Sequence, residues 1–193
     1  MKKLHSPLTY FVVLFIFWAK LYLVPHFDKR YVLNQCTIIK IYDGDTVKLY
    51  CPERSKEERE VVLRLMLMDA FEKDQLSYDG KRIGEESTLY LKKLLRNKKK
   101  VFVQLEKKDK YGRSLGHLLL SDSESPFERV SYQMVKAGYA LIYPQTVFAS
   151  KEEKKIYDQA LSYASFTFNG VWDTQGAQAP WSFRKTNKVS KKR

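Results

Sequence analysis

The chain has 193 residues, of which 44% are hydrophobic and 14% aromatic. This composition can build a closed core, so it excludes a disordered chain or a collagen-like repeat. Two cysteines are too few for a disulfide scaffold. The 35 Lys and Arg residues outnumber the 22 Asp and Glu residues and give a formal net charge of +13. That excess favours a polyanionic partner, either nucleic acid or an anionic lipid surface.

The first segment has the pattern of a targeting or anchoring sequence. Two lysines precede an apolar run over residues 8–24, which is about as short as a bilayer-spanning helix can be. Ala19 is the only small residue near a possible cleavage point, and Phe17 stands where a signal peptidase needs a second one. We therefore expect residues 1–29 to be an uncleaved membrane anchor, with the domain outside the cytoplasm, periplasmic or extracellular. Secretion after signal cleavage and a buried N-terminal helix are the alternatives.

Strand and helix patterns alternate through the predicted domain, residues 30–174. Residues 36–42 and 46–50 flank an Asp-Gly turn and predict a hairpin. Period-2 and 3.6-residue patterns predict further strands and helices. The strands are expected at 61–68, 101–105 and 114–120, and the helices at 84–96, 127–137 and 151–168. Five strands interleaved with helices predict an α+β fold, a small barrel that carries three helices. Residues 175–193 predict a mobile basic tail.

Three separated patches place charged residues where chemistry could use them. An Asp-Gly-Asp turn spans residues 43–45, and a Lys-Tyr-Gly-Arg turn spans residues 110–113. Between them, Arg64 lies in an apolar strand, where it needs an anionic partner, and two carboxylates follow that strand. If the barrel brings the strand ends together, carboxylates and arginines meet. Carboxylates that hold a hard cation and guanidinium groups that bind phosphate suit phosphodiester hydrolysis.

In this order and spacing, the motifs resemble the staphylococcal nuclease (thermonuclease) family over residues 37–172. The matching runs lie at 41–49, 63–72, 109–113, 135–140 and 169–172. The resemblance implies a five-stranded OB-fold barrel with three α-helices. It also implies a Ca²⁺-dependent endonuclease that hydrolyses DNA and RNA with little sequence preference and leaves 3′-phosphate ends.

The resemblance assigns roles to individual residues. The family's Ca²⁺ ligands fall on Asp45, Asp69 and the carbonyl of Ala70, and Asp43 lies next to these ligands. The glutamate that serves as general base falls on Glu72. The groups that hold the scissile phosphate and the nucleotide's terminal phosphate fall on Arg64, Arg113, Lys110 and Tyr111.

Some features leave alternatives open. Phe71 stands where the family has a proline, so the backbone before Glu72 lacks that constraint. Cys36 and Cys51 lie near the two ends of the predicted hairpin and could form a disulfide or remain free thiols. The alternative function is a non-catalytic OB-fold module that binds nucleic acid, and the basic tail could instead lie on anionic lipid. We expect a monomer.

Overall fold

Residues 33–98, 100–123 and 125–190 are described by a computed structural model. The predicted N-terminal anchor lies outside these ranges. Within them, no helix is both long enough and apolar enough to cross a bilayer.

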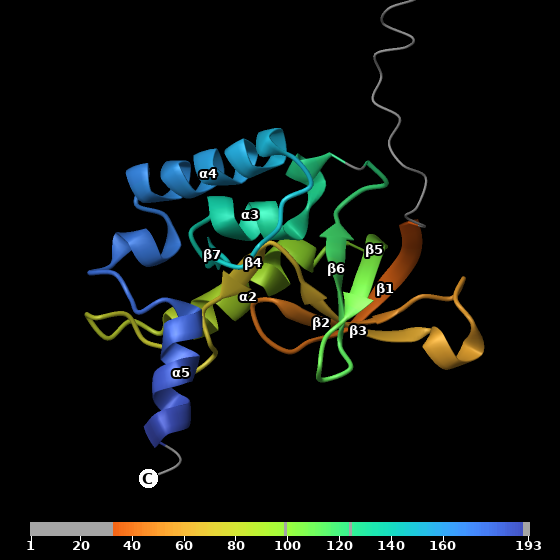
Figure 1. Ribbon diagram of the computed structural model, residues 1–193, viewed down its shortest axis with the longest axis horizontal. Helices are drawn as coiled ribbons and strands as arrows, with labels where there is room; N and C mark the ends of the chain where they lie inside the picture. Colours follow the sequence, from red (N-terminus) through yellow and green to blue (C-terminus); the bar gives the residue numbers. More distant parts are fainter. Residues whose placement is uncertain (1–32, 99, 124, 191–193) are drawn as a thin grey trace, which may run out of the picture. The chain divides into compact units, whose positions relative to one another are not determined.

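Five strands close into a barrel in the order β1-β2-β3-β6-β5 (Figure 1). Their bounds are β1 Leu33–Ile41, β2 Thr46–Tyr50, β3 Glu60–Leu65, β5 Val101–Lys108 and β6 Ser114–Leu119. Neighbouring strands are antiparallel except β3 and β6, which run parallel. The predicted α+β barrel is therefore confirmed.

Alternating side chains fill the barrel, as the period of a strand requires. In β3, Val61, Leu63 and Leu65 are buried, whereas the residues between them are only half-buried. Val47 and Leu49 of β2 are fully buried in the same core. This alternation leaves Arg64 on the other side of the strand from the core residues, at the edge of the barrel.

The three predicted helices are present (Figure 1). They are α2 Ile83–Leu95, α3 Val130–Lys136 and α4 Lys151–Phe166, and the short 3₁₀ helices are η1 Lys56–Glu58, η2 Pro126–Glu128 and η3 Gly170–Asp173. Helix α4 packs on α3 rather than on the barrel. The start of α4 is capped because the Ser150 side chain accepts a hydrogen bond from the Glu153 backbone N–H at 3.0 Å. The Tyr157 hydroxyl lies 2.7 Å from Ser131 Oγ and joins α4 to α3.

The predicted strand over residues 61–68 is interrupted. β3 ends at Leu65, and Leu67 has a positive φ of 70°, which is uncommon for a residue with a side chain. The turn redirects the chain into β4 (Met68–Ala70), which pairs with β7 (Ala140–Ile142) in a separate two-stranded sheet. Asp69 lies in this small sheet rather than in the barrel.

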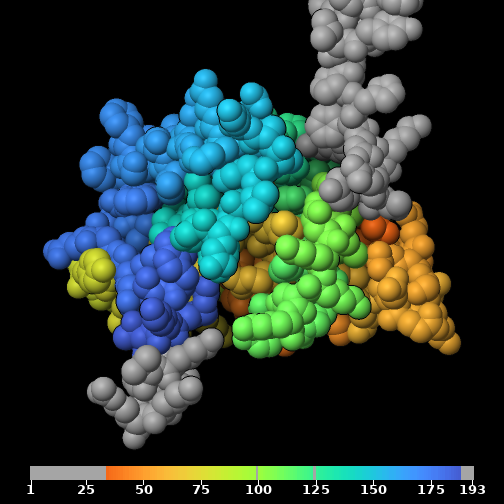
Figure 2. All heavy atoms as spheres, viewed as in Figure 1, coloured from red at the N-terminus to blue at the C-terminus, as the bar shows by residue number. Residues whose placement is uncertain are grey.

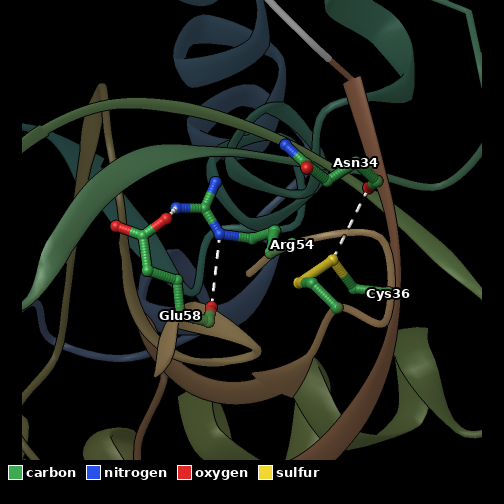
Figure 3. Close-up of a disulfide and its surroundings, with 5 residues drawn as sticks. Asn34, Cys36, Arg54 and Glu58 are labelled. Carbon is green, nitrogen blue, oxygen red and sulfur yellow. Dashed lines mark hydrogen bonds and ion pairs between the residues drawn. A yellow bond between two sulfur atoms is a disulfide. The ribbon is translucent and has the colours of Figure 1, made fainter. Parts of the chain in front are cut away.

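A disulfide joins Cys36 of β1 to Cys51, the residue that follows β2 (Figure 3). Both residues are buried, and Cys36 Sγ lies 3.6 Å from the Asn34 carbonyl oxygen. The loop after Cys51 is held on the surface by Arg54, which contacts the Glu58 carboxylate at 2.7 Å. The sequence left open whether these cysteines form a disulfide or remain free thiols, and the structure has the disulfide.

The C-terminal region differs from the mobile tail that the sequence predicts. Residues Pro180–Ser190 form a fourth helix, α5, drawn in dark blue in Figure 1. The Gly176 carbonyl accepts a hydrogen bond from the Tyr78 backbone N–H at 2.8 Å. Proline is favoured at the first position of a helix, where it needs no backbone partner. This segment therefore packs on the domain instead of extending from it.

Candidate active site

The Asp-Gly-Asp turn holds Asp45 at the junction of β2 with β4 and α2. The Asp43 carboxylate accepts a hydrogen bond from the Asp45 backbone N–H at 3.0 Å. Gly44 is closely packed, since a Cβ there would lie 2.3 Å from Ser87 Oγ and 2.7 Å from Ala70 Cβ. A glycine is therefore needed for the turn to approach β4. In this structure Asp43 shapes the turn that carries Asp45.

Arg64 bridges two buried carboxylates. Its Nη1 lies 2.7 Å from Asp45 Oδ1 and its Nη2 lies 2.6 Å from Asp69 Oδ1. Asp45 Oδ1 also accepts a hydrogen bond from the Thr46 hydroxyl at 2.8 Å. The bridge provides the anionic partner that the sequence required for Arg64. A guanidinium has five N–H donors, and among the described residues Arg64 uses two of them in this bridge, so donors remain for a further oxyanion.

Burial and ion pairing act against each other in the pair of Asp45 and Arg64. Burial raises the pKa of Asp45 from 3.8 to about 7, although the Arg64 guanidinium opposes the rise. Burial would lower the pKa of Arg64, but the carboxylates of Asp45 and Asp69 outweigh it and the pKa stays above its ordinary value. Arg64 therefore remains charged.

The loop that carries Glu72 is held by buried neighbours. The Phe71 side chain packs in a small apolar cluster with Ile83 and Val171. Fully buried Gln75 accepts a hydrogen bond from the Glu72 backbone N–H at 3.1 Å, and its own N–H donates to the Glu72 carbonyl at 2.8 Å. Because Phe71 replaces the family's proline, the sequence predicts a less constrained backbone here. In the structure, packing of the Phe71 side chain supplies a constraint instead.

The carboxylates suit a hard divalent cation, because Ca²⁺ prefers oxygen ligands and buried acids gain from a nearby positive charge. Asp45 Oδ2 lies 3.4 Å from the Ala70 backbone N–H, which places Asp45 against the segment that carries Asp69 and Ala70. As the described side chains stand, however, no three acidic, histidine or cysteine residues are gathered closely enough to hold a metal. Guanidinium groups lie among the carboxylates instead.

One of those guanidinium groups belongs to Arg184 of α5, which sequence reasoning missed. Arg184 contacts both oxygens of Asp69, at 3.0 and 2.6 Å, and Glu72 Oε1 at 2.5 Å. These carboxylates raise its pKa above the ordinary arginine value in spite of its partial burial. The proline that begins α5 was the available signal for a helix, but no local pattern indicates a contact across 115 residues.

Arg113 and its neighbours lie on the turn between β5 and β6. Arg113 Nη2 contacts the Asp109 carboxylate at 2.7 Å, so its ion pair lies within the turn and not with the carboxylates that Arg64 bridges. The Lys110 Nζ and the Arg113 guanidinium lie 5.1 and 5.5 Å from the centre of the exposed Tyr111 ring. Figure 2 shows this turn, in light green, across a hollow from α5, in dark blue. The structure thus brings together four of the predicted site residues, Asp45, Arg64, Asp69 and Glu72. Lys110, Tyr111 and Arg113 lie on a separate turn.

Residues 62–174 match the family described as Staphylococcal nuclease homologue. The chain belongs to this family. Membership confirms the resemblance, and the matched range contains Arg64, Asp69, Glu72 and Arg113. The turn with Asp43 and Asp45 lies before the matched range.

Several proteins named as endonucleases are similar to the chain. Endonuclease YhcR of Bacillus subtilis is 27% identical over 75% of the chain, but the match spans only 12% of that protein. An uncharacterized endonuclease of Haemophilus influenzae is 28% identical over 81% of the chain and 76% of its own length. An uncharacterized endonuclease of Escherichia coli O157:H7 is 28% identical over 76% of the chain and 82% of its own length.

Proposed function

We propose that this protein is an endonuclease that hydrolyses phosphodiester bonds of DNA and RNA with low sequence specificity. The observation that carries the proposal is the bridge of Arg64 between two buried carboxylates, with Glu72 beside them. Family membership and the relatives named as endonucleases support it. We further propose Ca²⁺ as the cofactor, 3′-phosphate ends as the products and a monomer as the active form.

The carboxylates of Asp45 and Asp69 and the carbonyl of Ala70 would hold the cation, which supplies positive charge to the scissile phosphate. Glu72 would take a proton from the attacking water while the water oxygen bonds to phosphorus. The bond from phosphorus to the 5′-oxygen would break at the same time, and the departing 5′-oxygen would take up a proton from solvent to give the 5′-hydroxyl end. Arg64 would stabilise the charge that develops on the phosphate oxygens. Its position between two anions orients the guanidinium before substrate arrives.

The β5–β6 turn would supply the remaining contacts with substrate. Arg113 would act as a second phosphate ligand, and Lys110 and Tyr111 would contact the nucleotide's terminal phosphate. All three lie on one exposed turn with the ring between the two cations. The excess of positive charge on the chain would add salt-sensitive attraction for nucleic acid.

We also propose that the domain works outside the cytoplasm, anchored by the N-terminal segment or secreted after its cleavage. The Cys36–Cys51 disulfide supports this placement, because disulfides persist in oxidising compartments and are rare in the cytosol.

The test is cleavage of single-stranded DNA and of RNA by the full-length chain in a mild detergent, with Ca²⁺ or with EDTA. We expect cleavage only with Ca²⁺, new 5′-hydroxyl ends, and a rate lowered by about 10²-fold or more in Glu72→Gln and Arg64→Ala. Glu60→Gln is the matched control, because Glu60 is exposed at the other end of β3 and pairs with Lys48. Salt-sensitive binding without cleavage under any divalent metal would contradict the proposal and favour a binding module.

A further inference from the structure

The helix α5 places a positive charge on the acidic side chains of the candidate site. Arg184 binds Asp69 through two nitrogens and Glu72 through one of them. In the proposed function, Asp69 holds the cation and Glu72 takes the proton. Arg184 therefore contacts the two side chains that the proposed chemistry needs. A basic segment that only attracted nucleic acid would have no need of them.

The contacts leave Asp69 without a free oxygen. Its Oδ1 accepts hydrogen bonds from Arg64 and Arg184, and its Oδ2 accepts another from Arg184. The Asp69 side chain is fully buried, so it has no solvent-facing side on which to bind anything else. A cation that bound Asp69 would therefore need the Arg184 guanidinium to leave.

The attachment of α5 is local and partial. Gln75 donates a hydrogen bond to the Gln178 carbonyl at 2.5 Å, and the Trp181 ring packs edge-on against Tyr143. Pro180 is the only residue of α5 that is buried among those whose side chains are described. Apart from the ion pairs of Arg184, few buried contacts hold this helix, so once a cation replaces those pairs α5 can open at much lower cost than the barrel.

We propose that α5 is an autoinhibitory element: Arg184 occupies the place of the divalent cation, and cation binding and the docked state of α5 exclude each other. This inference rests on the cation site of the proposed function. The exclusion is reciprocal, so whatever releases α5 strengthens cation binding, and bound cation weakens the attachment of α5.

Calcium titration calorimetry on the full-length chain in detergent tests this competition without any measurement of activity. We expect Arg184→Gln to bind Ca²⁺ at least tenfold more tightly than the unaltered chain. Lys185→Gln removes the same charge from the next, exposed residue of α5 and should leave the affinity unchanged. Circular dichroism of each variant checks that the fold is retained. In the unaltered chain, saturating Ca²⁺ should also speed amide hydrogen exchange over residues 181–190.

Equal affinities in Arg184→Gln and the unaltered chain would overturn the inference, as would weaker binding in Arg184→Gln or no Ca²⁺ binding in either protein. Failure of the proposed function is a separate result. If Arg184→Gln binds Ca²⁺ more tightly but cleaves nothing, the autoinhibitory role of α5 is supported and the nuclease function is contradicted. If the chain cleaves with Ca²⁺ but Arg184→Gln leaves the affinity unaltered, the nuclease function is supported and the autoinhibitory role is contradicted.

Discussion

Arg64 sets the charge balance of the site at the scale of single residues. It compensates Asp45, which has 3% of its surface exposed, and Asp69, which has none exposed. Removing Arg64 would leave the buried Asp45 carboxylate without its cationic partner, whereas Arg184 would still contact Asp69, and the loss of one partner of a buried pair costs more than the pair contributes. The arginine is therefore required by the fold as well as by the proposed chemistry.

This dependence predicts a strong energetic coupling between Arg64 and Asp45. We expect Arg64→Ala to lower the free energy of unfolding by about 3 kcal/mol. The loss should be smaller by about 1 kcal/mol or more when Asp45→Asn has already removed the charge. Urea denaturation in EDTA of the unaltered chain, the two single variants and the double variant measures the coupling, at a pH well above 7 so that Asp45 is ionised.

The pair of half-buried Lys48 with exposed Glu60, at 2.6 Å, is the matched control for this cycle. Its coupling should stay below about 1 kcal/mol because water screens both charges. If Arg64 and Asp45 showed a coupling no larger than that of Lys48 and Glu60, the site would not depend on this charge pair.

Sequence reasoning predicted some residues of the site and not others. Arg64 could be predicted because a charge in an apolar strand demands a partner, and acidic residues at the neighbouring strand ends were the available ones. Arg184 could not be predicted, since charge alone does not distinguish an arginine that enters a site from the solvated lysines around it. The anchoring of Phe71 depends on Ile83 and Val171, which converge only in the folded chain.

At the scale of elements, those with their own periodicity could be predicted. The apolar spacing of α2 and the alternation in β2 and β3 each follow from a local repeat. Strands β4 and β7 have three residues each, too few to show a repeat, and they depend on the positive φ of Leu67. The same turn carries Asp69 out of the barrel, so the unpredicted elements are the ones that complete the acidic cluster.

The disulfide also acts at the scale of elements, because it links β1 to the residue that follows β2. Its cysteines are 15 positions apart, and closing a loop of that size removes about 3 kcal/mol of chain entropy from the unfolded state. Reduction should therefore lower the free energy of unfolding by about 3 kcal/mol. Urea denaturation with and without a phosphine reductant measures the change.

A Cys36→Ala, Cys51→Ala double variant is the control for this reduction. Its stability should already be low and should not respond to the reductant. A full-length chain that unfolds at the same urea concentration with and without reductant would show that the barrel does not need this link.

At the scale of the whole molecule, we expect stability in acid to depend on a buried histidine of β6. His117 lies on β6, is 6% exposed, and its Nδ1 has no hydrogen-bond partner among the described residues. Glu106 is the nearest carboxylate, with Oε1 3.8 Å from His117 Nε2. Burial lowers the pKa of His117 from 6.5 to about 3, and the positive charge of Arg129 acts in the same direction.

The sign of the pH dependence follows from this depressed pKa. The unfolded chain takes up a proton on His117 near pH 6.5, whereas the folded chain does not do so until about pH 3. The stability that comes from keeping His117 neutral in the fold is complete above pH 6.5. It is lost as the pH falls from 6.5 toward 3, at about 1.4 kcal/mol per pH unit. Between pH 6.5 and 5 the unaltered chain should lose about 2 kcal/mol more than His117→Gln, which has no such group to titrate. Urea denaturation at the two pH values measures both losses, and equal losses would mean that His117 is already protonated inside the fold.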